Sequence, residues 1–309
     1  MRFFVSANIK ENKPLYYTVL FFLLFLLLYW LASWVFFYTK YGFTYSSVFK
    51  YFFTDEEFPE AISLSQVSED LHVSLFLKAF FFLVLFSLFL LSNFSERLKL
   101  SLTILSFFFG LLESLSDLFI LYLSPIFIYL KLLSFFGFQV FTGIALILTL
   151  IFLLSKENER PPGKSQIKLI IFLFSLFLVA FVLTNFLVFF SKMGISLDSI
   201  KDYYLGNPET FSKPKTFEGM FKVIYPHLLS MAVFSIVVAH FLFFTPAKGK
   251  VFLSASLFIL SFLDNILGLL IRFVHPSFAL IKLLTFLLLQ AILLYVSFLL
   301  VFYSRKKGT

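Results

Sequence analysis

Cysteine is absent from this chain of 309 residues, and charged residues are scarce. Without thiols there can be no disulfide, thiolate metal site, iron–sulfur cluster or covalently attached c-type haem. Charged residues make up only 14% of the chain, whereas 60% of the residues are hydrophobic. A soluble domain with that balance would lack the polar residues that cover a water-facing surface. The sequence therefore excludes an ordinary soluble domain and indicates the lipid bilayer as its surroundings.

Apolar runs of membrane-spanning length recur along the chain, and they predict an all-α, polytopic membrane protein with eight transmembrane helices. The first run begins at Leu15, after the basic residues Arg2, Lys10 and Lys13. It is too long for the core of a signal peptide, so we interpret it as an uncleaved first span. The predicted spans are 15–38, 70–92, 99–122, 126–154, 167–191, 220–245, 251–274 and 277–303.

The second half of the chain repeats the first at an offset of 151 to 155 residues. His72 is matched by His227, and Glu113 is matched by Asp264. Single matches are weak in a chain rich in Leu and Phe, but collinear matches at polar residues indicate a duplication. Further matched pairs are Pro125 with Pro276, Lys131 with Lys282, and Gln139 with Gln290.

Four spans per repeat is an even number, which predicts two parallel four-helix repeats that enter the membrane in the same sense. We predict a first repeat over 1–154, a charged linker over 155–166 and a second repeat over 167–309. The linker and both termini carry most of the excess of Lys and Arg. We therefore predict a bacterial inner membrane protein with both termini and the linker in the cytoplasm. Because the net charge of +8 lies in loops between spans, no nucleic-acid partner is expected.

Histidine is the remaining candidate for ligating iron, because polar residues at membrane depth need a partner, a cavity or a function. His72 and His227 occupy matched positions near the predicted outer interface. If the repeats face each other, the two imidazoles approach one site, as bis-His ligation of haem b requires. Interfacial histidines that are bonded to the long loops are the alternative. His240 lies about 140° from His227 around the helix, which disfavours a second haem. His275 precedes Pro276 and is expected to cap a helix end, with a proton carrier or an alternative ligand as the other interpretations.

Three carboxylates lie within the predicted spans. Glu113 and Asp264 are matched near mid-span, and Asp117 follows one turn after Glu113 on the same face. Buried carboxylates of this kind shuttle protons or bind a cation. A structural ion pair between Lys78 and Asp117, which lie at similar depth, is the alternative.

Polar groups outside these candidates predict structure rather than chemistry. Gln139 and Gln290 are expected to make hydrogen bonds between helices. The connections 39–69 and 192–219 each hold an aromatic, helix-like stretch that is expected to lie flat in the interface or to cover a cavity. The acidic run 55–57 is expected to be solvated. The chain has no glycine-rich phosphate loop, nucleophile triad or His-Glu-x-x-His motif.

Four short segments stand out in the second repeat: Tyr203-Tyr204-Leu205-Gly206, Lys215-Thr216-Phe217-Glu218, His227-Leu228-Leu229 and His240-Phe241-Leu242. The stretch of about 45 residues that holds them resembles a set of uncharacterised bacterial four-span membrane proteins. Their pattern is Tyr-Tyr-x-Gly, then Lys-Ser/Thr-Phe, then a His-x-His-Leu-Phe segment and a later His-Leu-Phe. Tyr225 stands in place of the first His of the pair. The resemblance implies a multi-span architecture and no particular chemistry.

The leading hypothesis is a respiratory-type membrane subunit with haem b between His72 and His227. Glu113, Asp117 and Asp264 would then move protons, with a quinone as electron partner and other respiratory subunits as neighbours. The alternative is a transporter or channel whose acids line a pathway, and the third possibility is a structural subunit of a membrane complex. Whether the protein is an enzyme is left open by the sequence.

Overall fold

A computed structural model describes residues 9–54, 60–160 and 162–305. Within these residues the chain forms ten α-helices, two 3₁₀ turns and no strand. The predictions about Arg2 and the acidic run 55–57 lie outside the described residues. The helices of the first half are α1 (Lys13–Tyr41), α2 (Tyr45–Phe53), α3 (Leu64–Phe89), α4 (Glu96–Tyr122), the turn η1 (Pro125–Phe127) and α5 (Ile128–Leu154). Those of the second half are α6 (Lys164–Met193), α7 (Leu197–Leu205), the turn η2 (Pro208–Thr210), α8 (Phe217–Phe244), α9 (Lys250–Phe273) and α10 (Phe278–Arg305).

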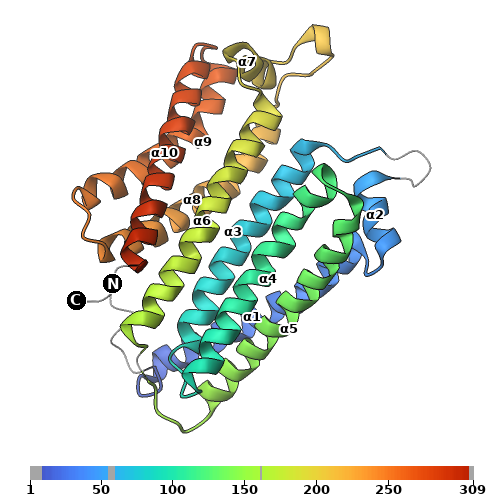
Figure 1. Cartoon of the computed structure of the whole chain (residues 1–309). Coiled ribbons are helices and arrows are strands. Elements are labelled where there is room, and N and C mark those ends of the chain that lie inside the picture. Colours follow the sequence, from blue (N-terminus) through green and yellow to red (C-terminus); the bar gives the residue numbers. More distant parts are fainter. Residues whose placement is uncertain (1–8, 55–59, 161, 306–309) are drawn as a thin grey trace. The chain divides into compact units, whose positions relative to one another are not determined.

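Eight of these helices are long and apolar enough to cross a membrane, and each falls on a predicted span. The two remaining helices, α2 and α7, are the short aromatic segments predicted in the long connections. The prediction of an all-α, eight-span membrane protein is therefore confirmed. Figure 1 shows the order of the elements along the chain.

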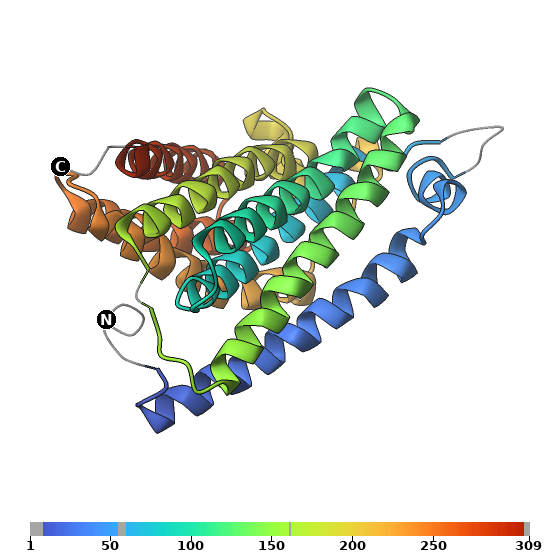
Figure 2. The same ribbon diagram turned by 60° about the horizontal axis from the view of Figure 1, so that its bottom comes forward.

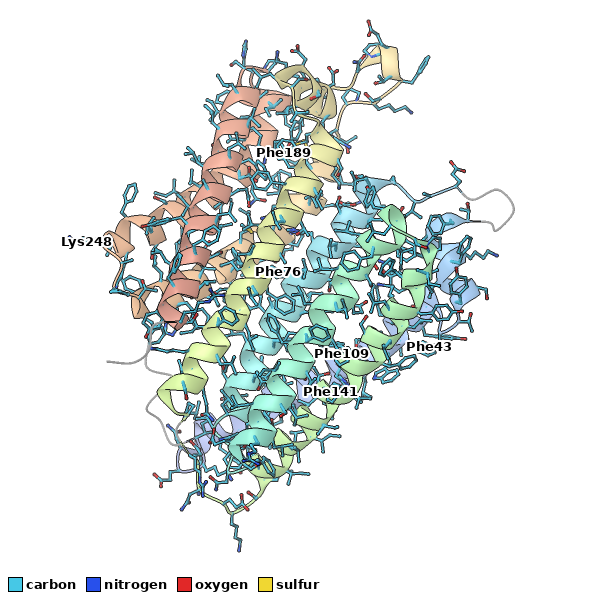
Figure 3. The ribbon with its side chains drawn as sticks, viewed as in Figure 1. Phe43, Phe76, Phe109, Phe141, Phe189 and Lys248 are labelled. Carbon is cyan, nitrogen blue, oxygen red and sulfur yellow. The ribbon has the colours of Figure 1, made fainter. Side chains whose placement is uncertain are left out.

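The chain divides into two compact units, Met1–Phe174 (unit 1) and Ser175–Thr309 (unit 2), and the division falls within α6. The boundaries 1–154 and 167–309 that the sequence suggested stay a prediction. In unit 1, α4 and α5 form an antiparallel hairpin, α3 packs against both, and α1 runs alongside α5 (Figure 2). Phe109 of α4 and Phe141 of α5 stack between these two helices with ring centroids 5.5 Å apart (Figure 3).

The helices α2 and α7 begin in the same way in the two units. Each follows a glycine with φ of +70°, Gly42 or Gly194, a conformation that glycine adopts at low cost. Each also starts with a reciprocal cap between a hydroxyl residue and the serine three positions later. These capping pairs are Thr44 with Ser47 and Ser196 with Ser199.

The apolar core beneath α2 is repeated beneath α7. Phe37 of α1 stacks on Phe135 of α5 with ring centroids 3.7 Å apart. At an offset of 151 or 152 residues, Phe189 stacks on Phe286 at 4.0 Å. Every other buried member of the first cluster has a counterpart in the second at the same offsets. These pairs are Tyr41 with Met193, Val48 with Ile200, Phe52 with Tyr204, Ile120 with Ile271, and Ile128 with Ala279.

The opposite end of unit 1, which we call its linker end, is held by hydrogen bonds from the segment before α1. The amine of Lys10 donates to the carbonyl oxygens of Phe152, Ser155 and Glu157 at the end of α5. These bonds join the segment before α1 to the C-terminal end of α5 and stabilise that end. Burial is the main reason that the pKa of Lys10 is lowered. The segment before α1 and the linker thus lie at the same end of unit 1.

Candidate functional site

Four charged side chains are buried together inside unit 1, and we call them the buried charge network. Lys78 comes from α3, Glu113 and Asp117 from α4, and Lys131 from α5. Their exposed fractions are 7%, 7%, 5% and 1%. The two acids share a face of α4 because they are four residues apart, and the antiparallel return of α5 brings Lys131 opposite them.

The signs of the charges alternate through the network. Lys78 forms an ion pair with Glu113, and its amine also donates to the hydroxyl of Ser114 at 2.7 Å. Lys131 bridges the two acids, with its amine 3.2 Å from Glu113 Oε1 and in an ion pair with Asp117. Two positive and two negative charges thus balance within one site.

The predicted pair between Lys78 and Asp117 is wrong. Lys78 forms its ion pair with Glu113, which lies one helical turn earlier on α4. Asp117 forms its ion pair with Lys131. The prediction compared depths along α3 and α4 only. It did not account for α5, whose return past α4 supplies a second lysine.

Unit 2 holds the corresponding half of this network. The amine of Lys282 on α10 lies 2.8 Å from Asp264 Oδ1 on α9, and it donates to the backbone carbonyl of Asp264 at 2.6 Å. Lysine and acid are 18 residues apart here, as they are for Glu113 and Lys131. The acid–lysine pair is therefore part of the repeat.

The second acid of the network, Asp117, has no counterpart in unit 2. The residue that matches Asp117 at an offset of 151 is Gly268, and a Cβ there would lie only 2.8 Å from the ring of Tyr204. The Tyr204 side chain on α7 therefore occupies the space beside this turn of α9. Burial raises the pKa of Tyr204 well above its usual value, and the negative charge of Asp264 adds to the rise. Unit 2 thus has one lysine–carboxylate pair, and the buried side chain of Tyr204 lies beside the next turn of the same helix.

A further polar cluster lies at the end of unit 1 that carries α2, which we call the α2 end. Asp70 on α3 accepts a hydrogen bond from the Tyr51 hydroxyl at 2.8 Å. The amine of Lys40, at the end of α1, lies 2.7 Å from the same oxygen. Burial raises the pKa of the Tyr51 phenol, and so do this hydrogen bond and the negative charges of Asp70 and Asp117.

The predicted haem ligands lie on corresponding helices of different units. His72 is half-buried on α3, and His227 is exposed on α8. His227 Nδ1 lies 2.8 Å from the carbonyl oxygen of Val223. Since a carbonyl oxygen only accepts, Nδ1 carries the proton and Nε2 of the neutral ring keeps its lone pair. The shared haem site between His72 and His227 stays a prediction.

The other two histidines lie on the surface of unit 2. His240 is exposed on α8, with its ring against Phe244. His275 Nδ1 accepts a hydrogen bond from the backbone N–H of Ser277 at 3.2 Å, as expected of a residue that caps a helix end. No group of three or more histidine and acidic side chains that could hold a metal ion occurs among residues 9–54, 60–160 and 162–305.

Sequence reasoning missed the two lysines that complete the buried pairs. Lys131 and Lys282 were recognised as matched residues of the repeat but not as partners of Glu113 and Asp264. The signal that would have identified them is the common offset, because lysine and acid are displaced by the same 151 residues. By contrast, the predicted interhelical bonds are confirmed. The amide of Gln139 donates to Ser33 at 2.7 Å, and that of Asn185 donates to Gln290 at 2.9 Å.

These features define a polytopic transmembrane protein in which one helical arrangement occurs twice. The Aq_1264_TM family, a transmembrane helical domain, matches residues 42–160 and again residues 194–309. The chain belongs to this family. Both matches begin after the first span of their half, so the repeated family unit contains one short helix and three spans. Comparison with curated proteins and with solved structures gives no significant match.

Proposed function

We propose that this protein moves protons across the membrane, with Glu113, Asp117 and Asp264 as the groups that bind them. The observation that supports the proposal most is the buried charge network of unit 1. Its acid–lysine half recurs in unit 2 as Asp264 with Lys282. This is the transporter or channel alternative of the sequence, with a proton as the transported ion.

Stability alone does not account for four charges in this position. Removing charges from water costs several kcal/mol per ion, and replacing a buried ion pair with apolar residues is often neutral or stabilising. In a membrane the penalty favours apolar residues still more, so ionisable residues within spans usually mark ion or proton pathways. Glu113 and Asp264 each lie nine residues before the end of their helix, which corresponds to a depth of about 14 Å. A membrane-spanning bundle needs no charge at that depth for its own packing.

The composition of the network favours a proton over a metal cation. A cation that entered the site would meet the amines of Lys78 and Lys131, each within bonding distance of a carboxylate. A proton needs no extra space, since it binds to a carboxylate that is already present. When Lys131 passes a proton to Asp117, both groups become neutral, and the reverse transfer restores the ion pair. The site therefore has protonation states that interconvert by moving one proton over one hydrogen bond.

Proton flux into liposomes tests this proposal. The purified protein is reconstituted with a pH-sensitive dye inside the vesicles, and flux is driven by a potassium diffusion potential. We expect Glu113→Gln and Asp117→Asn to lower the flux by about tenfold or more, since each removes a proton acceptor. Glu218→Gln is the matched control, because Glu218 is an exposed acid paired with Lys222 on α8. Flux that persists in the combined Glu113→Gln and Asp264→Asn variant would exclude the proposal.

A second candidate keeps the haem that the sequence suggested, with His72 and His227 as axial ligands and a quinone as electron partner. The observation that favours it is the bond from His227 Nδ1 to Val223, which leaves Nε2 available for iron. In this case the carboxylates would accompany electron transfer within a respiratory assembly. A reducible bis-His absorption spectrum that disappears in His227→Ala would support this candidate, and its absence from the purified protein would exclude it.

We also propose that the linker end of unit 1 lies in the cytoplasm of a bacterial cell. The support is the excess of Lys and Arg in the segments that meet there. Because the chain has no cysteine, single substitutions test this cleanly. Asn12→Cys should resist a membrane-impermeant maleimide in intact cells, and Ser124→Cys, at the opposite end, should react. The reverse pattern would contradict the proposed orientation.

A further inference from the structure

The acid at the α2 end of unit 1 differs from those of the buried charge network because it reaches the surface. The side chain of Asp70 is 29% exposed, and that of its partner Lys40 is 17% exposed. Three helices meet at this carboxylate, since Lys40 lies on α1, Tyr51 on α2 and Asp70 on α3. A proton from water can therefore bind to Asp70 without first entering the interior of unit 1.

Two tyrosines lie between Asp70 and the buried charge network. The ring of Tyr41, which is buried, lies 4.4 Å from the amine of Lys131. The same ring lies 4.7 Å from the ring of Tyr51, and the Tyr51 hydroxyl donates to Asp70. Neighbouring side chains thus lead from Asp117 and Lys131 to the surface, and each bears a charge or a hydroxyl.

Carboxylates at both ends of this series of side chains affect the pKa of Tyr51. The pKa of Tyr51 is raised first by burial and then by its hydrogen bond to Asp70, while the charge of Asp117 also contributes. Tyr51 therefore responds to a carboxylate of the buried charge network as well as to the surface carboxylate. A neutral phenol is suited to relay a proton because its oxygen accepts one while its O–H donates another.

We propose that Asp70 is the group through which protons pass between the water at the α2 end and the buried charge network of unit 1, with Tyr51 and Tyr41 as the relay. This inference rests on the proposed proton movement and specifies its route. A proton from water binds to the Asp70 carboxylate, and the Tyr51 O–H, which donates to Asp70 in the structure, turns inward. Asp70 then donates its proton to the Tyr51 oxygen as Tyr51 releases its own proton inward. Tyr41 repeats the exchange, and the proton neutralises Asp117. No bond other than O–H is made or broken, and each phenol is unchanged at the end.

Unit 2 lacks this route. The counterpart of Tyr41 is Met193, which has no exchangeable proton. The counterpart of Asp70 is Tyr225, which is 80% exposed. The ring of Tyr203, which matches Tyr51, lies 4.4 Å from the amine of Lys215. The entry group is therefore a property of the first repeat.

The test uses the full chain in the liposome assay, with Asp70→Asn and Tyr51→Phe as the main variants. We expect each to lower proton flux by about tenfold, because each interrupts the relay at one oxygen. Asp70→Glu should restore most of the flux, since it keeps a carboxylate. Asp198→Asn is the matched control, because Asp198 is an exposed acid of α7 whose pKa is lowered by its hydrogen bond with Lys201. It should leave the flux unchanged.

The outcomes separate this inference from the function on which it rests. Wild-type flux in folded Asp70→Asn and Tyr51→Phe, together with loss of flux in Glu113→Gln, would overturn the entry route and leave proton movement intact. Absence of flux in the wild-type protein would overturn both. Tryptophan fluorescence verifies the fold of unit 1, since Trp30 and Trp34 both lie on α1. If Asp70→Asn fails to fold, Tyr51→Phe decides, because it removes one oxygen and keeps the ring.

Discussion

Substitution of Lys131 by methionine should destabilise unit 1 more than any other single change within the buried charge network. Lys131 is 1% exposed and is the lysine paired with both acids. Methionine keeps most of its length but leaves one lysine facing two carboxylates, a net charge of −1 in a buried site. Breaking a buried ion pair by removing one partner costs about 3–5 kcal/mol, mainly because the other charge stays buried. We expect a loss in that range in the free energy of unfolding.

Unfolding by a denaturing detergent, followed by tryptophan fluorescence, measures this loss within unit 1 alone. The chain has two tryptophans, and both face α5. The indole N–H of Trp30 donates to the carbonyl of Gln139 at 3.1 Å, and Trp34 packs edge-on against Phe135. The matched control is Lys282→Met, which breaks the equivalent pair in unit 2. It should leave the tryptophan transition unchanged.

The combined variant Lys131→Met with Asp117→Asn provides the sharpest test. It removes one positive and one negative charge, so the site returns to neutrality with Lys78 and Glu113 still paired. We expect it to be more stable than Lys131→Met alone, because the unpaired carboxylate is gone. A combined loss equal to the sum of the two single losses would show that the groups do not interact. That result would refute the reasoning.

Three further predictions concern uncharged residues. Gly268→Ala should cost unit 2 about 1–3 kcal/mol, seen as faster hydrogen exchange in α9, because the new Cβ meets the Tyr204 ring at 2.8 Å. Gln139→Leu should cost about 0.6–1.7 kcal/mol in the tryptophan-monitored transition through loss of its bond to Ser33, and no change would show that this bond contributes nothing. Gly42→Ala should cost about 1–2 kcal/mol in the same transition, since alanine is strained at a φ of +70°. A neutral effect there would contradict the assigned backbone conformation.

The duplicated architecture could be predicted from the sequence because each of its signals lies within one segment or in one comparison of the two halves. Apolar runs of bilayer length identify helices without reference to other segments, since backbone groups in lipid must be satisfied within the helix. The matched pairs Pro125 with Pro276, Lys131 with Lys282, and Gln139 with Gln290 all lie 151 residues apart. A direct comparison of the two halves therefore reveals them. The short helix α2 was likewise indicated by the aromatic, helix-like stretch in the connection 39–69.

Only half of the candidate site could be predicted from the sequence, and Lys131 illustrates the physical reason. Near the start of a span, a lone lysine is as typical of a residue that extends to the interface as of an ion-pair partner. Asp70 gave no signal either, because its partners Lys40 and Tyr51 lie on two other helices and 30 and 19 positions away. Contacts of that kind depend on how helices pack and not on the residues adjacent in the chain.

The sequence by itself determined the class of protein, the number of spans, the repeat and the three carboxylates within the membrane. Only the tertiary structure decided which lysine neutralises which carboxylate. It also showed that Asp70 of α3 binds Lys40 at the end of α1 and Tyr51 of α2. Hydrophobicity acts on each segment separately, so composition suffices to reveal it. An ion pair acts over a few ångströms between side chains, and only packed helices bring those side chains together.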